Sequence, residues 1–126
     1  MNLSEYFEKT KGYGVLSTAD ASGKIDSAIY ARPYFVDDET VAFIMPERLT
    51  YSNLCENPHA VYLFIQEGGG NLGKRLYMVR IREEVNEELA DAITRRYDYT
   101  IAPGQMKRHV VYFTIERVLP LIGPGA

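Results

Sequence analysis

The sequence predicts an α+β domain in which an antiparallel β-barrel of about six strands carries two or three helices. Apolar segments with strand-like patterns recur along the chain, and short turn sequences separate most of them. Only two or three segments have a helical pattern, so most connections are short enough to be hairpins. Hairpins join antiparallel strands, whereas parallel strands need long crossovers, and this difference favours the antiparallel barrel.

The first third of the chain predicts a helix followed by two strands. Residues 2–9 form the expected helix, with Asn2 as its N-cap, Glu5 completing a capping-box pattern, and Gly12 ending it. Residues 13–20 are the first strand, and the sequence DASGK (20–24) supplies turn chemistry.

The run at residues 25–36 predicts one long strand, because its apolar and polar residues alternate. Ile25, Ile29 and Phe35 lie on the expected core face. Tyr30, Arg32 and Tyr34 lie on the opposite, more polar face. Arg32 would either steer a ligand or pair with an acidic side chain in solvent, with Asp26 and Glu39 as candidates. Pro33 indicates an edge, a bulge or a bend near the end of the strand.

The remaining elements follow from the same patterns. Residues 41–45 and 59–66 are continuous apolar strands, 67–73 form a glycine-rich loop, and 74–85 alternate again. Residues 86–99 are the clearest helix, with Asn86 as its cap. The last strand is expected at 110–119, after a loop that includes the basic triplet KRH at 107–109.

Composition excludes several classes of protein. A net charge of -3 argues against a nucleic-acid binder, whose affinity comes largely from Lys and Arg on phosphates. The single cysteine, Cys55, excludes an internal disulfide and is expected to be a buried, inert thiol. Two histidines far apart in sequence leave little for a metal site, and no segment reaches the ~20 apolar residues of a membrane span. We therefore expect a cytoplasmic protein without a metal site.

The connection PERLTYSNLCENP (residues 46–58) contains the main functional signal. A helix beginning near Thr50 leaves its first N–H groups without intrahelical partners, and Arg48 adds a positive charge beside them. Such a group of donors suits a phosphate. Alternatively, Thr50 only caps a connecting helix and Arg48 points to water. The residues alone leave both interpretations open.

The order of these elements resembles the pyridoxamine 5'-phosphate oxidase-like superfamily of FMN-binding split barrels. The resemblance covers nearly the whole chain. It is most specific in ERLTYSNLCENPHAVYLF (47–64), where a basic or hydroxyl cluster, Asn-Leu, Asn-Pro and an apolar strand follow one another. It implies a mainly antiparallel six-stranded split β-barrel with flanking helices, with residues 1–126 as a single domain.

The resemblance also implies a cofactor, a partner and an activity. FMN would bind at a homodimer interface and exchange electrons with a small-molecule donor or acceptor, in an oxidoreductase or electron-transfer protein. The phosphate would lie at residues 48–50, and the rest of the cofactor would lie along the end of one strand and the edge of another. The residues expected to hold FMN are Tyr30, Ala31, Arg32, Met45, Pro46, Arg48, Leu49 and Thr50.

Two departures from the family narrow the activity. The oxidase has a Ser-Arg-Lys run where this chain has Arg-Leu-Thr, and its tryptophan-containing C-terminal segment has no counterpart in a chain without tryptophan. Vitamin B6 oxidation is therefore not expected. Two alternatives remain open: a split barrel that binds haem or a deazaflavin without turnover, with His59 and His109 as the histidines on offer, or a ligand-free dimeric scaffold.

Overall fold

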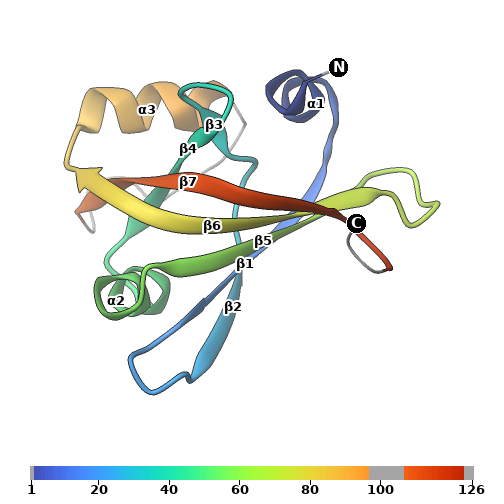
Figure 1. Ribbon diagram of the computed structural model, residues 1–126. Coiled ribbons are helices and arrows are strands. Elements are labelled where there is room, and N and C mark those ends of the chain that lie inside the picture. The colour runs from blue at the N-terminus through green and yellow to red at the C-terminus, as the bar shows by residue number, and fades with distance from the viewer. Residues whose placement is uncertain (1, 97–106, 124–126) are drawn as a thin grey trace.

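The computed structural model describes residues 2–96 and 107–123 of the chain, and its described strands form one antiparallel sheet (Figure 1). The strands pair in the order β2-β1-β5-β6-β7-β4-β3. The elements in chain order are α1 (Leu3–Lys9), β1 (Gly12–Ala19), β2 (Ile25–Ile29), β3 (Tyr34–Phe35), β4 (Thr40–Pro46), α2 (Leu49–Glu56), β5 (His59–Gln66), β6 (Gly73–Glu84), α3 (Glu87–Arg96) and β7 (Arg108–Pro120).

The predicted α+β class is confirmed, but the described sheet has seven strands where six were expected. The difference arises because the predicted strand at residues 25–36 is broken at 30–33 into β2 and β3. Pro33 has no N–H to donate to a ladder and restricts the residue before it. β2 pairs with β1 and β3 with β4, so the two halves lie on opposite edges of the sheet.

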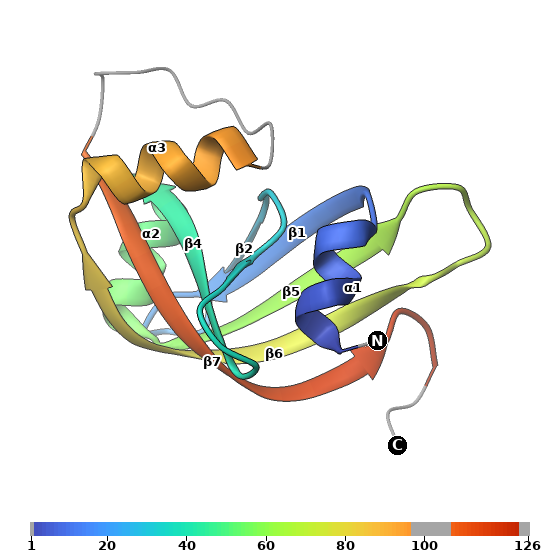
Figure 2. The same ribbon diagram turned by 90° about the horizontal axis from the view of Figure 1, so that it is seen from above.

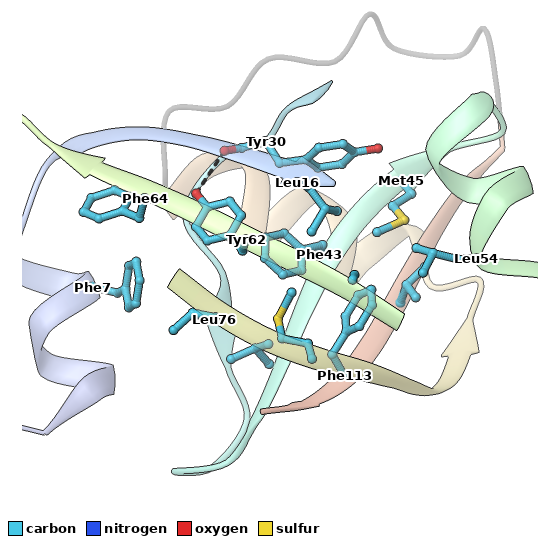
Figure 3. Close-up of a cluster of buried hydrophobic side chains, with 14 residues drawn as sticks. Phe7, Leu16, Tyr30, Phe43, Met45, Leu54, Tyr62, Phe64, Leu76 and Phe113 are labelled. Carbon is cyan, nitrogen blue, oxygen red and sulfur yellow. Dashed lines mark hydrogen bonds between the residues drawn. The ribbon is translucent and has the colours of Figure 1, made fainter. Parts of the chain in front are cut away.

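The sheet is strongly curled, although its strand pairing does not close into a complete barrel. Four residues span roughly 14 Å at most, so the connection 30–33 holds the two edges of the sheet close together. The curl encloses the larger core cluster, which runs from Phe7 and Phe64 at one end to Met45 and Leu54 at the other (Figure 3). The fold is therefore consistent with a split barrel.

The structure reverses the expected faces of β2. Ile25 and Ile29 are 74% and 64% exposed, whereas Ala28 packs on the core and Tyr30 is buried in it. Alternation gives two faces but does not say which one is inward. Here the outward face is itself apolar, so hydrophobicity did not distinguish the two.

The helices cover the openings and one outer side of the curled sheet (Figures 1 and 2). Asn2 caps α1 as predicted, accepting a hydrogen bond from the Glu5 N–H at 2.8 Å. The helix ends at Thr10, and Gly12 instead begins β1. Asn86 caps α3 through the Leu89 N–H at 3.0 Å, while residues 97–99 of the predicted helix lie outside the described residues.

A second, smaller core cluster joins α3 to the outer side of β4 and β7. Ala90 and Ile93 of the helix pack there on alternate residues of the two strands, whose other residues face the main core. β4 and β7 are therefore buried on both faces, which explains the continuous apolar sequence of residues 41–45.

Candidate functional site

Helix α2 begins directly after β4, and its first turn has no side-chain cap. Arg48 occupies the N-cap position, and its N–H donates to the Pro46 carbonyl at 2.8 Å. The expectation that Thr50 caps the helix is therefore wrong, because this tight turn starts the helix earlier and places Thr50 inside the first turn. The N–H groups of residues 49–51 find no acceptor among the described residues. They remain available to a ligand.

Thr50 and Arg48 add side-chain donors to these backbone groups. Thr50 is only 4% exposed, and its hydroxyl has no hydrogen-bond partner within residues 2–96 and 107–123. Arg48 is exposed, and no carboxylate of the described chain pairs with it. Among the described residues, Glu83 Oε2 is the only fully buried polar side-chain atom without a partner, so the Thr50 hydroxyl keeps some accessible surface.

Both side chains line a cavity of about 190 Å³ between β2 and the start of α2. The end of β2 forms one wall, and the turn that leads from β4 into α2 forms the other. The cavity is lined by Asp26, Ala28, Ile29, Tyr30, Pro46, Arg48, Leu49 and Thr50. It brings together five of the eight residues expected to hold FMN.

Tyr30 is held in place by both of its backbone groups. Its N–H donates to the Gly14 carbonyl at 3.0 Å, and its carbonyl accepts from the buried Tyr62 hydroxyl at 3.0 Å (Figure 3). Burial raises the pKa of Tyr62, so this hydroxyl stays protonated and can donate. A Cβ on Gly14 would lie 1.8 Å from the Tyr62 Oη, so only glycine leaves room for this contact.

The other three residues expected at the site lie elsewhere. Ala31 and Arg32 line a second cavity of only about 20 Å³ on the side of Tyr30 that faces α3. The Arg32 Nη1 donates to the carbonyls of Phe7 at 2.9 Å and Thr10 at 3.0 Å, so this arginine closes the last turn of α1. Met45 is fully buried in the main core and lines neither cavity.

A larger groove of about 240 Å³ lies on the outward face of β1, β5 and β6. His59, Tyr77 and Glu116 are among the residues that line it, and no lysine or arginine does. Because it offers an anion neither a fixed cation nor a helix N-terminus, we regard the smaller cavity at α2 as the candidate site. The greater volume of the groove does not outweigh this difference in chemistry.

Behind the start of α2 lies a charged cluster that sequence reasoning missed. His109 was expected in a charged loop, but it belongs to β7 and is 7% exposed. Its Nε2 lies 3.1 Å from Glu47 Oε2 and its Nδ1 lies 2.9 Å from Glu83 Oε2. The Tyr51 ring stacks on the imidazole with centroids 4.1 Å apart. The triplet KRH predicted the charge but not this burial.

The expectation of a buried Cys55 is wrong. Cys55 is exposed rather than buried, because it lies on the outer side of α2 while Leu54 faces the core. Among the described residues, no three His, Cys, Asp or Glu side chains are grouped so that they could hold a metal ion. No helix in the described part of the chain is long and apolar enough to cross a membrane.

Neither a protein-family model nor a curated protein sequence matches the chain. Solved structures do match it. An F420 reductase superposes with a TM-score of 0.76 at 14% identity, covering 94% of this chain and 97% of that one. An FMN-binding protein from Syntrophomonas wolfei subsp. wolfei has a TM-score of 0.76 at 22% identity, with 96% and 84% covered. The haem storage protein HutZ from Vibrio cholerae has a TM-score of 0.64 at 13% identity, with 95% of each chain covered.

Two proteins provisionally named pyridoxamine 5'-phosphate oxidases, from Lactobacillus delbrueckii and Listeria innocua, also match with TM-scores of 0.66. Identities at this level show a common fold and leave ligand and activity open. The chain has the pyridoxamine 5'-phosphate oxidase-like split-barrel fold, as the resemblance at residues 47–64 predicted.

Proposed function

We propose that residues 1–126 form a single FMN-binding domain with oxidoreductase or electron-transfer activity. Thr50 carries this proposal, because its hydroxyl has no partner in the described chain and its side chain lines the cavity beside Arg48. A phosphate monoester brings about -1.5 to -2 charges and three acceptor oxygens near neutral pH. The hydroxyl, the guanidinium and the free N–H groups of α2 are the donors that such a group needs.

The cavity suits the phosphate end of the cofactor better than the whole molecule. A volume of about 190 Å³ is below the roughly 300–1,000 Å³ of pockets that enclose a drug-sized ligand. Ile29, Tyr30 and Pro46 supply apolar and aromatic surface next to the donors. The flat ring system would need further surface beyond this single chain.

A second copy of the chain would supply that surface. Tyr13, Ile25, Ile29 and Ile65 are between 42% and 74% exposed, and they share the outward face of β1, β2 and β5. Cross-strand partners such as Tyr13 and Ile65 make this face continuous. Apolar patches of this kind mark association surfaces, and this one reaches the cavity through Ile29. We therefore propose a homodimer with the cofactor at its interface.

FMN, when bound, would supply the electron chemistry, and the protein would supply binding, orientation and electrostatics. Arg48 and Thr50 would hold the phosphate, while Tyr30 would present its ring at the other wall of the cavity. The electron donor or acceptor would be a small molecule. Vitamin B6 is not proposed as the substrate, since the chain has no tryptophan to match the substrate-binding segment of the oxidase. We place the protein in the cytoplasm, where the exposed Cys55 would stay reduced.

The proposal is tested by the visible spectrum of the purified protein and by titration with FMN and riboflavin. Riboflavin lacks the phosphate, so the difference between the two affinities isolates the phosphate site. Thr50→Val keeps the shape and removes the hydroxyl, and Arg48→Ala removes the cation. Each lost charge-assisted hydrogen bond costs about 1.5–3 kcal/mol, so FMN affinity should fall by roughly 10- to 150-fold in each variant.

The matched control is Arg95→Ala, which removes an exposed arginine from α3, away from the cavity. We expect it to retain wild-type FMN affinity, and all three variants to bind riboflavin as weakly as the wild type. Wild-type FMN affinity in both site variants would show that the phosphate is not held here. A colourless protein whose melting temperature ignores added FMN would favour the ligand-free scaffold.

Binding of haem or a deazaflavin is the second candidate, supported by the structural similarity to the haem storage protein HutZ and to an F420 reductase. For haem, His109 is a poor axial ligand because a carboxylate faces each of its ring nitrogens. His59 is exposed and lines the 240 Å³ groove, so it is the accessible histidine. A Soret band that is lost in His59→Ala would establish this alternative. Mass identification of the released ligand would separate FMN from a deazaflavin.

A further inference from the structure

His109 lies at the end of the sheet that α2 covers, opposite Met45 in the β4–β7 pairing. Carboxylates approach it from two different elements. Glu47 comes from the turn between β4 and α2 and accepts a hydrogen bond at Nε2, while Glu83 comes from β6 and lies 2.9 Å from Nδ1. Tyr51 covers the face of the ring from α2. The imidazole of β7 therefore contacts β6, the turn between β4 and α2, and the first turn of α2.

Only a protonated imidazole can donate toward both carboxylates. A neutral histidine donates from only one nitrogen and leaves the second carboxylate without a positive charge beside it. Glu83 Oε2 is buried and makes no hydrogen bond, because its contact with Nδ1 has the distance but not the direction of one. A positive charge on the ring would compensate this buried carboxylate oxygen.

The other groups around His109 reinforce this assignment. Burial and the neighbouring Glu83 raise the pKa of Tyr51, which therefore stays neutral beside the ring. Arg108, the next residue of β7, is already paired with Glu87 and Asp91 of α3. Glu47 and Glu83 therefore face His109, whereas Glu87 and Asp91 of α3 pair with Arg108.

Glu47 links this cluster to the candidate anion site. It is flanked in sequence by Pro46 and Arg48, which both line the cavity, and Tyr51 directly follows Thr50. When His109 loses its proton, two carboxylates lose their common counter-ion. Glu47, whose side chain is 51% exposed, can turn to water, whereas Glu83 at 29% is more confined. The turn that positions the Arg48 guanidinium and the first N–H groups of α2 then loses its anchor.

We propose that His109 is a positioning residue that makes anion binding at the start of α2 dependent on pH, with the site strongest while His109 is protonated. This inference rests on the proposed phosphate site. Protonation of His109 strengthens the site in two ways. It anchors the turn that aligns the donors, and it places one more positive charge near the anion. Linkage is reciprocal, so anion binding and protonation of His109 must strengthen each other.

The test compares the FMN affinity of the wild type with that of His109→Gln between about pH 5.5 and 8.5, where histidines usually titrate. Glutamine donates to one carboxylate and does not titrate. The FMN phosphate itself titrates in this range, but both proteins experience that change, so their affinity ratio isolates His109. We expect the wild type to bind about tenfold more tightly at the acidic end and nearly equally at the alkaline end. His59→Gln, at the other histidine, should keep the wild-type pH profile.

Glu47→Gln provides a second variant that leaves the core intact, because its side chain is half exposed. The ratio of wild-type to Glu47→Gln affinity should change with pH as it does for His109→Gln. The ratio for Glu88→Gln, an equal charge change at an exposed position of α3, should stay constant. A ratio that stays constant with pH in both His109→Gln and Glu47→Gln would overturn the inference.

A readout without ligand separates this inference from the proposed function. In the free protein, the backbone amide NMR signals of residues 48–50 should shift with the titration of the His109 ring, and His109→Gln should abolish that shift. If these amides titrate but FMN never binds, the coupling stands and the ligand assignment fails. If FMN binds and the amides do not follow His109, the ligand assignment stands and the coupling is refuted.

Discussion

The buried hydrogen bond from Tyr62 to the Tyr30 carbonyl offers a direct test of how the two edges of the sheet are held together. Tyr62 is fully buried, and its hydroxyl is 3.0 Å from this carbonyl (Figure 3). Tyr62→Phe keeps the ring and removes only the hydroxyl. The Tyr30 carbonyl, at the start of the connection between β2 and β3, then loses the hydroxyl that donates to it.

Removing the donor of a buried hydrogen bond costs about 1–3 kcal/mol, and the Gly14 backbone beneath the ring leaves little scope for repacking. We therefore expect the free energy of unfolding to fall by about 1–2 kcal/mol for Tyr62→Phe. Urea denaturation followed by circular dichroism, at one fixed protein concentration, measures this change through the midpoint and the m-value.

Tyr13→Phe is the matched control, because Tyr13 is 69% exposed and its hydroxyl has no hydrogen-bond partner among the described residues. Its effect should stay within about 0.5 kcal/mol. If Tyr62→Phe is no more destabilising than Tyr13→Phe, the hydrogen bond does not anchor the connection. A fall in FMN affinity together with the loss of stability would link this anchor to the position of Tyr30 in the cavity.

Three further predictions concern other contacts of the fold. Gly14→Ala should destabilise the protein by more than about 2 kcal/mol in urea denaturation, and by less in a Tyr62→Leu background, because the clash is with that ring. Arg32→Met should increase hydrogen exchange in the last turn of α1, whose carbonyls lose their donor, and unchanged exchange would contradict that role. The Tyr112 hydroxyl is the main cause that lowers the pKa of Glu84. A lowered pKa stabilises the fold above the unfolded-state pKa and is lost as pH falls through the folded value, so Tyr112→Phe should make stability less sensitive to acid between about pH 5 and 3. An unaltered carboxyl titration of Glu84 by NMR would refute this.

Local sequence patterns predicted the helices well because caps and amphipathic periods act over only a few residues. Asn2 and Asn86 cap the helices that they were expected to cap, and the short helix after β4 lies within residues 46–58. The same patterns predicted strand positions to within a few residues. The α+β class and the split-barrel fold followed from the order of these elements.

Long-range pairing lay beyond those patterns. Nothing local to residues 25–36 indicates that its two halves pair on opposite edges of the sheet, because that depends on β1 and β4. The exposure of Ile25 and Ile29 is a similar case, since an outward apolar face has the same sequence period as a core face. The burial of His109 depends on Glu83, 26 positions away, and on Tyr51, 58 positions away.

The sequence by itself predicted a helix start with Arg48 and Thr50 between two apolar strands, and it left open whether this start binds a phosphate or only begins a connecting helix. These facts are local, since they depend on capping, helix polarity and the Asn-Pro stop. Only the tertiary structure decided that Tyr30 faces that helix start across a cavity, while Arg32 bonds the end of α1 and Met45 packs in the core. The physical reason is that a cavity is formed by residues from separate strands, whose approach is set by packing and sheet curvature rather than by neighbouring residues in the chain.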